Sequence, residues 1–316
     1  MNKMPVLYIV VPCYNEQAVI GETTRRLLLK LDEMIISGKC SEKSRILYVD
    51  DGSKDDTWEI ITRIFSQNER VCGLKLAHNK GHQNALYAGL MTARNFADCV
   101  ISMDADLQDD INVMDDFLDK FADGCEIVYG VRSNRDTDTK FKKATAQGFY
   151  KLMKFLGVET VYNHADYRLM SKKALDALSQ YDEVNLYLRG IVPDMGFKSD
   201  CVYYERGERF AGETKYPLKK MIGLAIQGVT SFSVKPLTMV SGLGLILSAL
   251  GAISLLISII VGVCGTNVST ALILSTIWLG CGIIVTCLGI VGEYVGKIYS
   301  ETKHRPKFIP ETFLKK

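Results

Sequence analysis

The sequence has no charged residue over one long stretch. The 57 residues from 236 to 292 contain no Asp, Glu, Lys, Arg or His. This length is enough for two membrane spans of about 20 residues each, and Gly265, Thr266 and Asn267 make the obvious turn between them. A buried helical hairpin of a soluble protein would normally keep one polar face, so that alternative is disfavoured. We therefore expect two transmembrane helices, at about 237–263 and 270–292.

Paired cysteines and a strong net charge are both missing. The nine cysteines are odd in number, none forms a Cys-x-x-Cys pair, and three of them lie in the uncharged stretch. These features argue against a disulfide framework and a zinc site, so we expect reduced cysteines that serve in packing. The net charge of +2 is too small to indicate a nucleic-acid partner.

The basic residues flank the uncharged stretch, and no export signal is apparent. The apolar segment 6–11 is broken by Pro12 and has neither a basic leader nor a small-residue cleavage site. The flanking cations are Lys215, Lys219, Lys220, Lys235, Lys297, Lys303, Arg305, Lys307, Lys315 and Lys316. By the positive-inside rule both termini should face the cytoplasm, which predicts a multi-pass protein of the inner (cytoplasmic) membrane. Residues 217–235 alternate lysine with apolar residues, as in an interfacial helix that meets anionic lipid.

Before this stretch, strand-like and helix-like patterns alternate. Apolar runs predict strands at 6–11, 45–49, 71–76, 99–103 and 126–130, and helical patterns lie at 18–36, 57–67, 79–94, 111–121 and 172–178. This order is typical of an α/β fold with a mostly parallel sheet, in which ligands bind at the carboxyl ends of the strands. We divide the chain into a cytoplasmic domain (1–216), an interfacial amphipathic helix (217–235), two spans (236–292) and a cytoplasmic tail (293–316).

Two carboxylates follow the strand predicted at 99–103. Asp104 and Asp106 are one residue apart, just past the carboxyl end of that strand. In this arrangement they can hold a hard divalent cation and leave positions open for a diphosphate. The Asp-x-Asp pattern alone is common by chance, so its meaning depends on the other motifs. The acidic residues that follow are expected to be solvated, namely Asp109, Asp110, Asp115 and Asp116.

Four segments together resemble the family 2 glycosyltransferases of the GT-A fold. They are 11–16, 50–53, 79–85 and 104–108, and they match that family in order and spacing. The segment 206–216, the two spans and the segment 292–306 look like the branch that transfers sugars to polyisoprenyl phosphates. That branch includes dolichol-phosphate mannose synthases and bactoprenol (undecaprenyl-phosphate) glucosyltransferases. The resemblance implies that residues 1–216 form a Rossmann-like GT-A catalytic domain.

The resemblance implies a nucleotide-sugar donor, most readily a UDP-sugar. Asp51 would accept a hydrogen bond from the imide N–H of uracil, and Glu16 would lie near the ribose. The implied donor-binding residues are Pro12, Tyr14, Asn15, Glu16, Asp50, Asp51, Ser53, Asn79, Gly81 and Asp104. Taken alone, the segment 50–53 would instead predict a helix N-cap with a tight turn.

The resemblance also implies a divalent metal, Mg²⁺ or Mn²⁺, that bridges the donor diphosphate. It makes Asp106 the principal ligand, Asp104 a ligand or sugar contact, and Gln108 a further oxygen donor. The ion would stabilise the negative charge that develops as the nucleotide leaves. Asp166 and Arg168 match a family position near the active site, with their role left open.

A polyprenyl phosphate acceptor would explain the arginines, because arginine binds phosphate oxygens bidentately. The candidates for the acceptor phosphate are Arg132, Arg135, Arg206, Arg209 and Lys215, with Lys142 and Lys143 touching lipid headgroups. An ordinary basic surface facing the membrane is the alternative for each of them.

Such an acceptor needs no catalytic base. A phosphomonoester is already anionic at pH 7, since its second pKa is about 6. We therefore expect His78, His82 and His164 to be structural or polar loop residues. The expected catalytic residues are Asp104, Asp106 and Arg132, in a displacement that inverts C1 of the sugar.

Several alternatives stay open. Glucose is favoured by the resemblance alone, and GlcNAc, galactose, a modified pentose or GDP-mannose are the other donors considered. A processive polysaccharide synthase would carry a Gln-x-x-Arg-Trp motif, and neither Trp58 nor Trp278 lies in one. A non-catalytic membrane adaptor is disfavoured by the carboxylate pair and the arginines. Small residues such as Gly242 and Gly244 would permit close helix packing, and hence a homo-oligomer.

Overall fold

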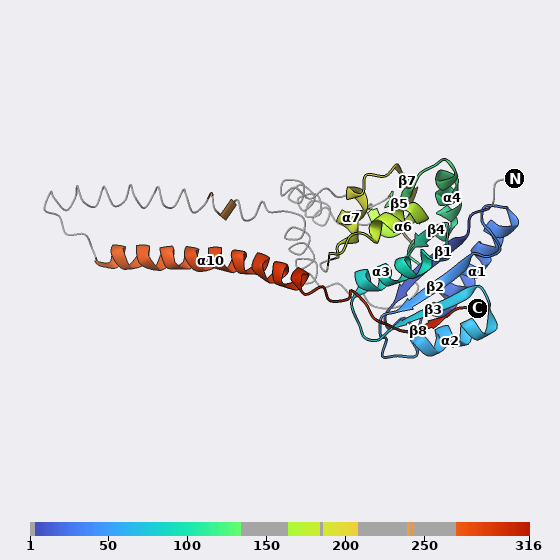
Figure 1. The fold of residues 1–316 in the computed structure, drawn as a ribbon, viewed down its shortest axis with the longest axis horizontal. Helices are drawn as coiled ribbons and strands as arrows, with labels where there is room; N and C mark the ends of the chain where they lie inside the picture. Colours follow the sequence, from blue (N-terminus) through green and yellow to red (C-terminus); the bar gives the residue numbers. More distant parts are fainter. Residues whose placement is uncertain (1–3, 134–163, 184–185, 208–238, 241, 243–269) are drawn as a thin grey trace.

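The computed structural model describes residues 4–133, 164–183, 186–207, 239–240, 242 and 270–316. Within these residues the chain forms a mixed eight-stranded sheet with the order β7-β5-β6-β4-β1-β2-β3-β8 (Figure 1). The strands are β1 (Leu7–Cys13), β2 (Arg45–Asp50), β3 (Val71–Leu76), β4 (Cys99–Ser102), β5 (Ile127–Arg132), β6 (His164–Ser171), β7 (Ser199–Tyr204) and β8 (Pro310–Leu314). The helices are α1 (Ile20–Ile36), α2 (Thr57–Gln67), α3 (His82–Ala93), η1 (Ile111–Val113), α4 (Met114–Ala122), α6 (Lys172–Leu178), α7 (Leu188–Asp194) and α10 (Thr270–Thr302).

The side chains of β1 are all buried and alternate between the two faces of the sheet. Leu7, Ile9 and Val11 lie in an apolar core that they share with α1, α2 and α4. Tyr8 and Val10 lie in a second core, which they share with α3, α6 and α7. Helices therefore cover both faces of the central strands, which explains why these strands read as continuous apolar runs.

The strand directions confirm the predicted α/β class and add antiparallel strands to it. β1 pairs in parallel with β2 and β4, and β2 pairs in parallel with β3. β6 is antiparallel to both of its neighbours, β4 and β5. The five strands expected from the apolar runs are all present, and so are the five expected helices. β6, α7, β7 and β8 were not predicted.

The chain returns to the sheet at its C-terminal end. β8 pairs antiparallel with β3, at the opposite edge from β7. Before it, Nζ of Lys307 donates a hydrogen bond to the carbonyl oxygen of Tyr181, 2.5 Å away, and lies 4.6 Å from the ring centre of Tyr87. After it, Nζ of Lys315 lies 3.6 Å from the ring centre of Phe96. The end of the segment predicted as a cytoplasmic tail thus forms an edge strand of the sheet.

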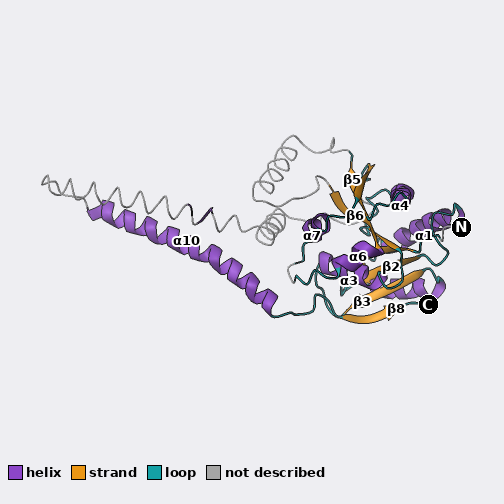
Figure 2. Cartoon of the chain, turned by 45° about the horizontal axis from the view of Figure 1, so that its top comes forward, coloured by secondary structure: helices purple, strands orange, loops and turns teal. Residues whose placement is uncertain are grey.

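α10 runs away from the sheet as one long helix in both views (Figures 1 and 2). It covers the second predicted span and continues past it to Thr302. The predicted interfacial helix and nearly all of the first predicted span lie outside the described residues. In the part of the chain that the structure describes, no helix combines the length and the apolarity that crossing a membrane requires. The membrane hairpin therefore stays a prediction.

α3 packs closely on the sheet because Gly89 has no side chain. A Cβ at this position would lie 2.4 Å from Cγ1 of Val10 and 2.7 Å from Cγ2 of Val49. These atoms belong to β1 and β2, in the middle of the sheet. The lack of a side chain therefore sets the distance between α3 and the strands that carry the site described below.

We predict that Gly89→Ala destabilises the protein by about 1–3 kcal/mol, because the added methyl group overpacks a core that cannot yield easily. The matched control is Gly21→Ala in α1, where an added Cβ meets no atom within 4 Å. That control should be neutral or slightly stabilising, since alanine favours a helix over glycine. Thermal unfolding of the detergent-purified full chain measures both changes. Equal melting temperatures for the two variants would contradict the close packing of α3.

Candidate functional site

The predicted site residues gather at one edge of the sheet. β1, β2, β3 and β4 run in parallel, so the loops that follow them meet at their carboxyl ends. These loops carry the four segments singled out in the sequence.

The loops after β1 and β2 are tied together by hydrogen bonds. The backbone N–H of Asn15 donates to Oγ of Ser53 at 3.0 Å, and Oδ1 of Asn15 accepts from the N–H of Lys54 at 2.8 Å. The N–H of Glu16 donates to Oγ1 of Thr57 at 2.9 Å. Asn15 has a φ of 53°, in the left-handed region that asparagine tolerates. Three predicted donor-binding residues, Asn15, Glu16 and Ser53, therefore lie on one connected wall.

Asp51 links this wall to the loop after β3. It is buried, and its carboxylate oxygens accept the backbone N–H groups of Lys80 at 2.7 Å and Gly81 at 2.9 Å. Gly52, with a φ of 66°, lies so close that a Cβ there would be 2.8 Å from the nitrogen of Asn79. Burial raises the pKa of Asp51, and the two N–H bonds partly oppose that shift. Asp51 therefore organises this loop, and its expected contact with a base stays a prediction.

The neighbouring acid, Asp50, forms the tight turn that the sequence allowed as an alternative. It is fully buried, and both of its oxygens lie 3.3 Å from the backbone nitrogen of Ser53. Of the other predicted donor residues, Pro12 is buried in β1, Tyr14 is half-buried and Asn79 is exposed at the same edge. The carboxylates after β2 thus shape the loops around the proposed donor site.

The Asp104–Asp106 loop is hydrogen-bonded to residues 206–207, which follow β7. Oδ1 of Asp106 accepts the N–H of Gln108 at 3.2 Å, and Leu107 between them has a φ of 58°. The backbone N–H of Gly207 donates to the carbonyl oxygen of Gln108 at 2.8 Å. The guanidinium of Arg206 donates to the side-chain oxygen of Gln108. The structure therefore brings Arg206, an expected phosphate ligand, to the predicted metal loop.

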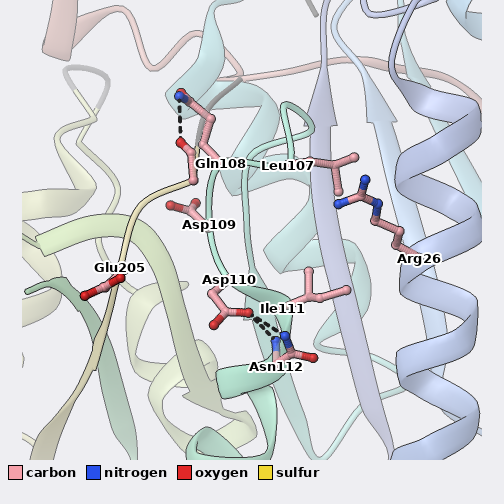
Figure 3. Close-up of a pocket in the computed structure, with 9 residues that line it drawn as sticks. Arg26, Leu107, Gln108, Asp109, Asp110, Ile111, Asn112 and Glu205 are labelled. Atoms are coloured by element: carbon pink, nitrogen blue, oxygen red, sulfur yellow. Dashed lines mark hydrogen bonds between the residues drawn. The ribbon is translucent and has the colours of Figure 1, made fainter. Parts of the chain in front are cut away.

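A cavity of about 290 Å³ lies beside this loop. Gln108 and Asp109 line it, with Arg26 of α1 on one side and Glu205 on the other (Figure 3). Neither Asp104 nor Asp106 is among its lining residues. The cavity therefore flanks the predicted metal site and is separate from it.

The donor set at this loop fits a Mg²⁺ or Mn²⁺ ion that is shared with a substrate. The described residues include no group of three or more His, Cys, Asp and Glu side chains that would enclose a metal ion. Asp104 and Asp106 are both half-buried, and burial, together with the negative charges of Asp166 and Asp106, raises the pKa of Asp104. Two carboxylates with open positions are what an ion bridging a diphosphate needs. The side-chain oxygen of Gln108 accepts from Arg206, and its second lone pair can still serve an ion.

Asp109 corrects the expectation that the acidic residues after this loop are solvated. Asp109 is only 4% exposed, and Oδ1 accepts the hydroxyl of Tyr204 at 2.5 Å. The same oxygen lies 3.7 Å from Nη2 of Arg132. Burial, together with the charge of Asp104, raises the pKa of Asp109 to about 6. Its sequence neighbours gave no sign of this role, because a buried and a solvated aspartate look alike in an acidic run.

Arg132, at the end of β5, is thereby placed near the carboxylate pair. Burial alone would lower the pKa of Arg132, but its hydrogen bond with Tyr204 and the charges of Asp109 and Asp104 raise it, and its Nε is buried without a hydrogen-bond partner among the described residues. Arg132 and Arg206 thus approach the Asp104–Asp106 loop from neighbouring segments. The other expected phosphate ligands, Arg135, Arg209 and Lys215, lie outside the described residues, as do Lys142 and Lys143.

A second charged cluster lies on the far side of Asp104, around Asp166 of β6. Nη2 of Arg168 lies 2.7 Å from Oδ1 of Asp166, and Nη2 of Arg189 lies 3.0 Å from Oδ2. Nε2 of His82 lies 3.5 Å from Oδ2 of Asp166 and 3.7 Å from Oδ1 of Asp104. The structure therefore joins Asp166 and Arg168, whose role the sequence left open, to the Asp104–Asp106 loop.

Ion pairing controls the protonation of this cluster. Burial alone would raise the pKa of Asp166, but the charges of Arg189 and Arg168 and the hydrogen bond with His82 bring it well below its usual range. Burial alone would lower the pKa of His82, but its bond to Asp166 and the charge of Asp104 raise it to about 9. Sequence reasoning treated His82 as a structural or polar loop residue and did not single out Arg189. His82 lies within one of the four motif segments, whereas no local pattern marks Arg189.

Comparison with known proteins agrees with this geometry. Residues 8–179 match the sequence profile described as glycosyl transferase family 2. The chain belongs to this family. The match includes the strands β1 to β6 and all four loops at the carboxyl edge. The suspected family resemblance is thus confirmed.

Relatives match this family 2 glycosyltransferase over nearly its full length. The glycosyltransferase YkoT of Bacillus subtilis is 54% identical over 308 residues, which cover 97% of this chain and 91% of the relative. A protein of Escherichia coli named prophage bactoprenol glucosyl transferase homolog is 37% identical, over 95% of this chain and 97% of its own. Among solved structures, the mannosyltransferase PcManGT from Pyrobaculum calidifontis is 17% identical with a TM-score of 0.45, over 96% of this chain and 88% of its own.

We predict that Tyr204→Phe destabilises this glycosyltransferase by about 1–3 kcal/mol, because it leaves the buried Asp109 without the hydroxyl that it accepts from. The adjacent Tyr203 is 67% exposed and supplies the control, Tyr203→Phe, which should be neutral. Chemical unfolding of the two variants side by side measures the difference. Equal stability would mean that Asp109 does not depend on Tyr204.

Proposed function

We propose that the protein is a membrane-bound, inverting glycosyltransferase that moves glucose from UDP-glucose to undecaprenyl or another polyprenyl phosphate. The observation that carries the proposal is the meeting of a carboxylate pair, Asp104 and Asp106, with two arginines, Arg132 and Arg206, at the edge of a nucleotide-binding type of sheet. A relative named a bactoprenol glucosyl transferase homolog, matched over nearly the whole chain, supports both glucose and the polyprenyl acceptor.

Each part of the edge has a task in this proposal. The connected loops with Asn15, Ser53 and Asp51 bind the nucleotide. Asp104 and Asp106 provide carboxylate oxygens for Mg²⁺ or Mn²⁺. That ion, when bound, would neutralise the diphosphate and stabilise the charge of the leaving nucleotide.

The acceptor phosphate binds to the arginines on the other side of the loop. Arg206 is exposed, and Arg132 keeps a buried donor without a partner in the described structure. One phosphate oxygen then attacks C1 of the sugar, the bond from C1 to the diphosphate breaks, and the nucleotide leaves with the electron pair. No proton has to be removed from the nucleophile, because the phosphomonoester is already anionic. A single displacement turns an α-linked donor into a β-linked lipid phosphosugar.

We further propose that residues 236–292 form the membrane hairpin, with the catalytic sheet and both termini on the cytoplasmic face. β8 pairs with β3, so the C-terminal strand lies on the same side of any membrane as the catalytic sheet. A chain that leaves the sheet after residue 207 and returns at Pro310 must cross an even number of times. Exposed apolar side chains along α10, including Ile284, Leu288 and Val295, suit contact with lipid.

We predict that the purified full chain, with Mg²⁺ or Mn²⁺ and undecaprenyl phosphate, transfers label from UDP-glucose to an organic-soluble lipid. Chelation with EDTA should abolish transfer, and Asp106→Asn should lower it at least about 100-fold. Asp116→Asn, at an exposed acid of α4, is the matched control and should transfer as wild type does. A panel of other nucleotide sugars tests the donor. The proposal fails if no donor labels the lipid, or if Asp106→Asn remains fully active.

We predict that a tag after Lys316 is protected inside intact cells and becomes accessible when the cytoplasmic membrane is opened. The reason is the pairing of β8 with the catalytic sheet, which keeps both on one side. A tag placed at the proposed turn, after Thr266, should be accessible from outside in the same cells. Accessibility of the C-terminal tag in intact cells would contradict the proposed topology.

A further inference from the structure

We propose that Arg189 is a catalytic residue that binds the acceptor phosphate, and that Asp166 is the positioning residue that holds its guanidinium in place. This inference rests on the proposed transfer to a lipid phosphate. It assigns a task to a side chain that no motif in the sequence marks, on the short helix α7.

Asp166 forms an ion pair with one edge of the Arg189 guanidinium. Nε of Arg189 lies 3.3 Å from Oδ1 of Asp166, and Nη2 lies 3.0 Å from Oδ2, so the contact is bidentate. These two contacts use Nε and Nη2, and the Arg189 side chain is 43% exposed. The guanidinium is therefore fixed on one edge, and the side chain is partly exposed.

Arg189 is one of two arginines that pair with Asp166. Arg168, which is 1% exposed, already lies 2.7 Å from Oδ1 of Asp166 and donates to the carbonyl oxygen of Leu188 at 3.4 Å. A buried carboxylate with one buried arginine partner is a complete ion pair. The second, half-exposed arginine is therefore available for another anion.

The backbone that carries Arg189 is firmly held next to the reacting groups. The N–H of Leu188 donates to Oε1 of Gln83 in the first turn of α3 at 2.9 Å. Leu188, Ile191 and Val192 of α7 are buried in the core beneath. His82, one residue before Gln83, lies 3.7 Å from Asp104, and the charge of Asp104 also acts on Arg189. Arg189 thus lies at the same edge as the carboxylate pair.

The charges of the substrates call for such a cation. The donor diphosphate carries about two negative charges, which one divalent ion offsets, and the acceptor phosphate adds about 1.5 to 2 more. Arg132 and Arg206 face Asp109 and Gln108, on one side of the loop. Arg189 supplies a fixed cation on the other side of Asp104. Asp166 is poorly suited to act as a base, because its arginine and histidine partners hold its pKa well below the usual range and so make it a weak proton acceptor.

The test compares Arg189→Gln and Arg189→Lys with the wild type in the full, detergent-purified chain. We expect Arg189→Gln to raise the KM for undecaprenyl phosphate about 10- to 100-fold, the loss of a charge-assisted contact, with the KM for UDP-glucose changed less than about twofold. The KM of Arg189→Lys for undecaprenyl phosphate should lie between those of the wild type and Arg189→Gln, since lysine keeps the positive charge but cannot form bidentate hydrogen bonds. Asp166→Asn should raise the same KM, because it removes the negative charge that holds the Arg189 guanidinium in place.

Arg94→Gln is the matched control. Arg94 also pairs with an acid, its Nε lying 3.6 Å from Oδ1 of Asp176, but it follows the far end of α3. Its variant should keep both KM values, and melting temperatures separate kinetic effects from unfolding. Should Arg189→Gln fail to fold, Arg189→Lys carries the test.

Three results would overturn the inference. The first is an unchanged acceptor KM in a folded Arg189 variant. The second is an equal rise in the KM values for donor and acceptor, which would make Arg189 a general structural residue. The third is a wild type that transfers no sugar, which refutes the proposed function and this inference with it. If the wild type transfers sugar and a folded Arg189 variant keeps the wild-type KM for the acceptor, only this inference is refuted.

Discussion

The burial of carboxylates at the carboxyl edge of the sheet is the constraint on which the site depends: Asp50, Asp51 and Asp109 are buried, and Asp166 is only 13% exposed. An ionised carboxylate is costly to bury unless charges or hydrogen bonds compensate it. Asp51 obtains this compensation from the backbone at 80–81, Asp109 from Tyr204 and Arg132, and Asp166 from two arginines and His82. Each acid is therefore bonded to a segment that is distant in the sequence and that lies at the carboxyl edge of the sheet. The contacts of these carboxylates, together with the strands that precede the loops, position the loops around the site.

The same constraint distinguishes one buried acid from two half-buried acids within one short segment. Asp109 is buried and held, whereas Asp104 and Asp106 are half-buried at the tip of the loop. A metal ion shared with a diphosphate needs carboxylates whose oxygens remain available, and it needs them at a fixed separation. Anchoring Asp109 to Tyr204 fixes the base of the loop. One acidic run thus serves two purposes that its composition alone does not distinguish.

The sequence predicted the parts of the fold that rest on local patterns. Apolar runs followed by helical spacing located β1 to β5 and their helices, because each strand and the helix after it are neighbours in the chain. β6, with the sequence His-Ala-Asp-Tyr-Arg-Leu-Met-Ser, contains no such run, and it enters the sheet by pairing with β4 and β5 from a distance. The burial of Arg168 and the position of Arg189 follow from that pairing. Local patterns carry no information about either.

This difference divides the site into two halves. The half proposed for the donor is made of loops within successive strand and helix units, and its residues were expected from the motifs. The half proposed for the acceptor comes from β5, β6, α7 and the end of β7, which meet only in the folded sheet. Both halves share one loop, because Gln108 is bonded to Gly207 and Asp109 to Tyr204, while Asp104 faces His82. Both proposed halves are therefore in direct contact with the loop that carries the carboxylate pair.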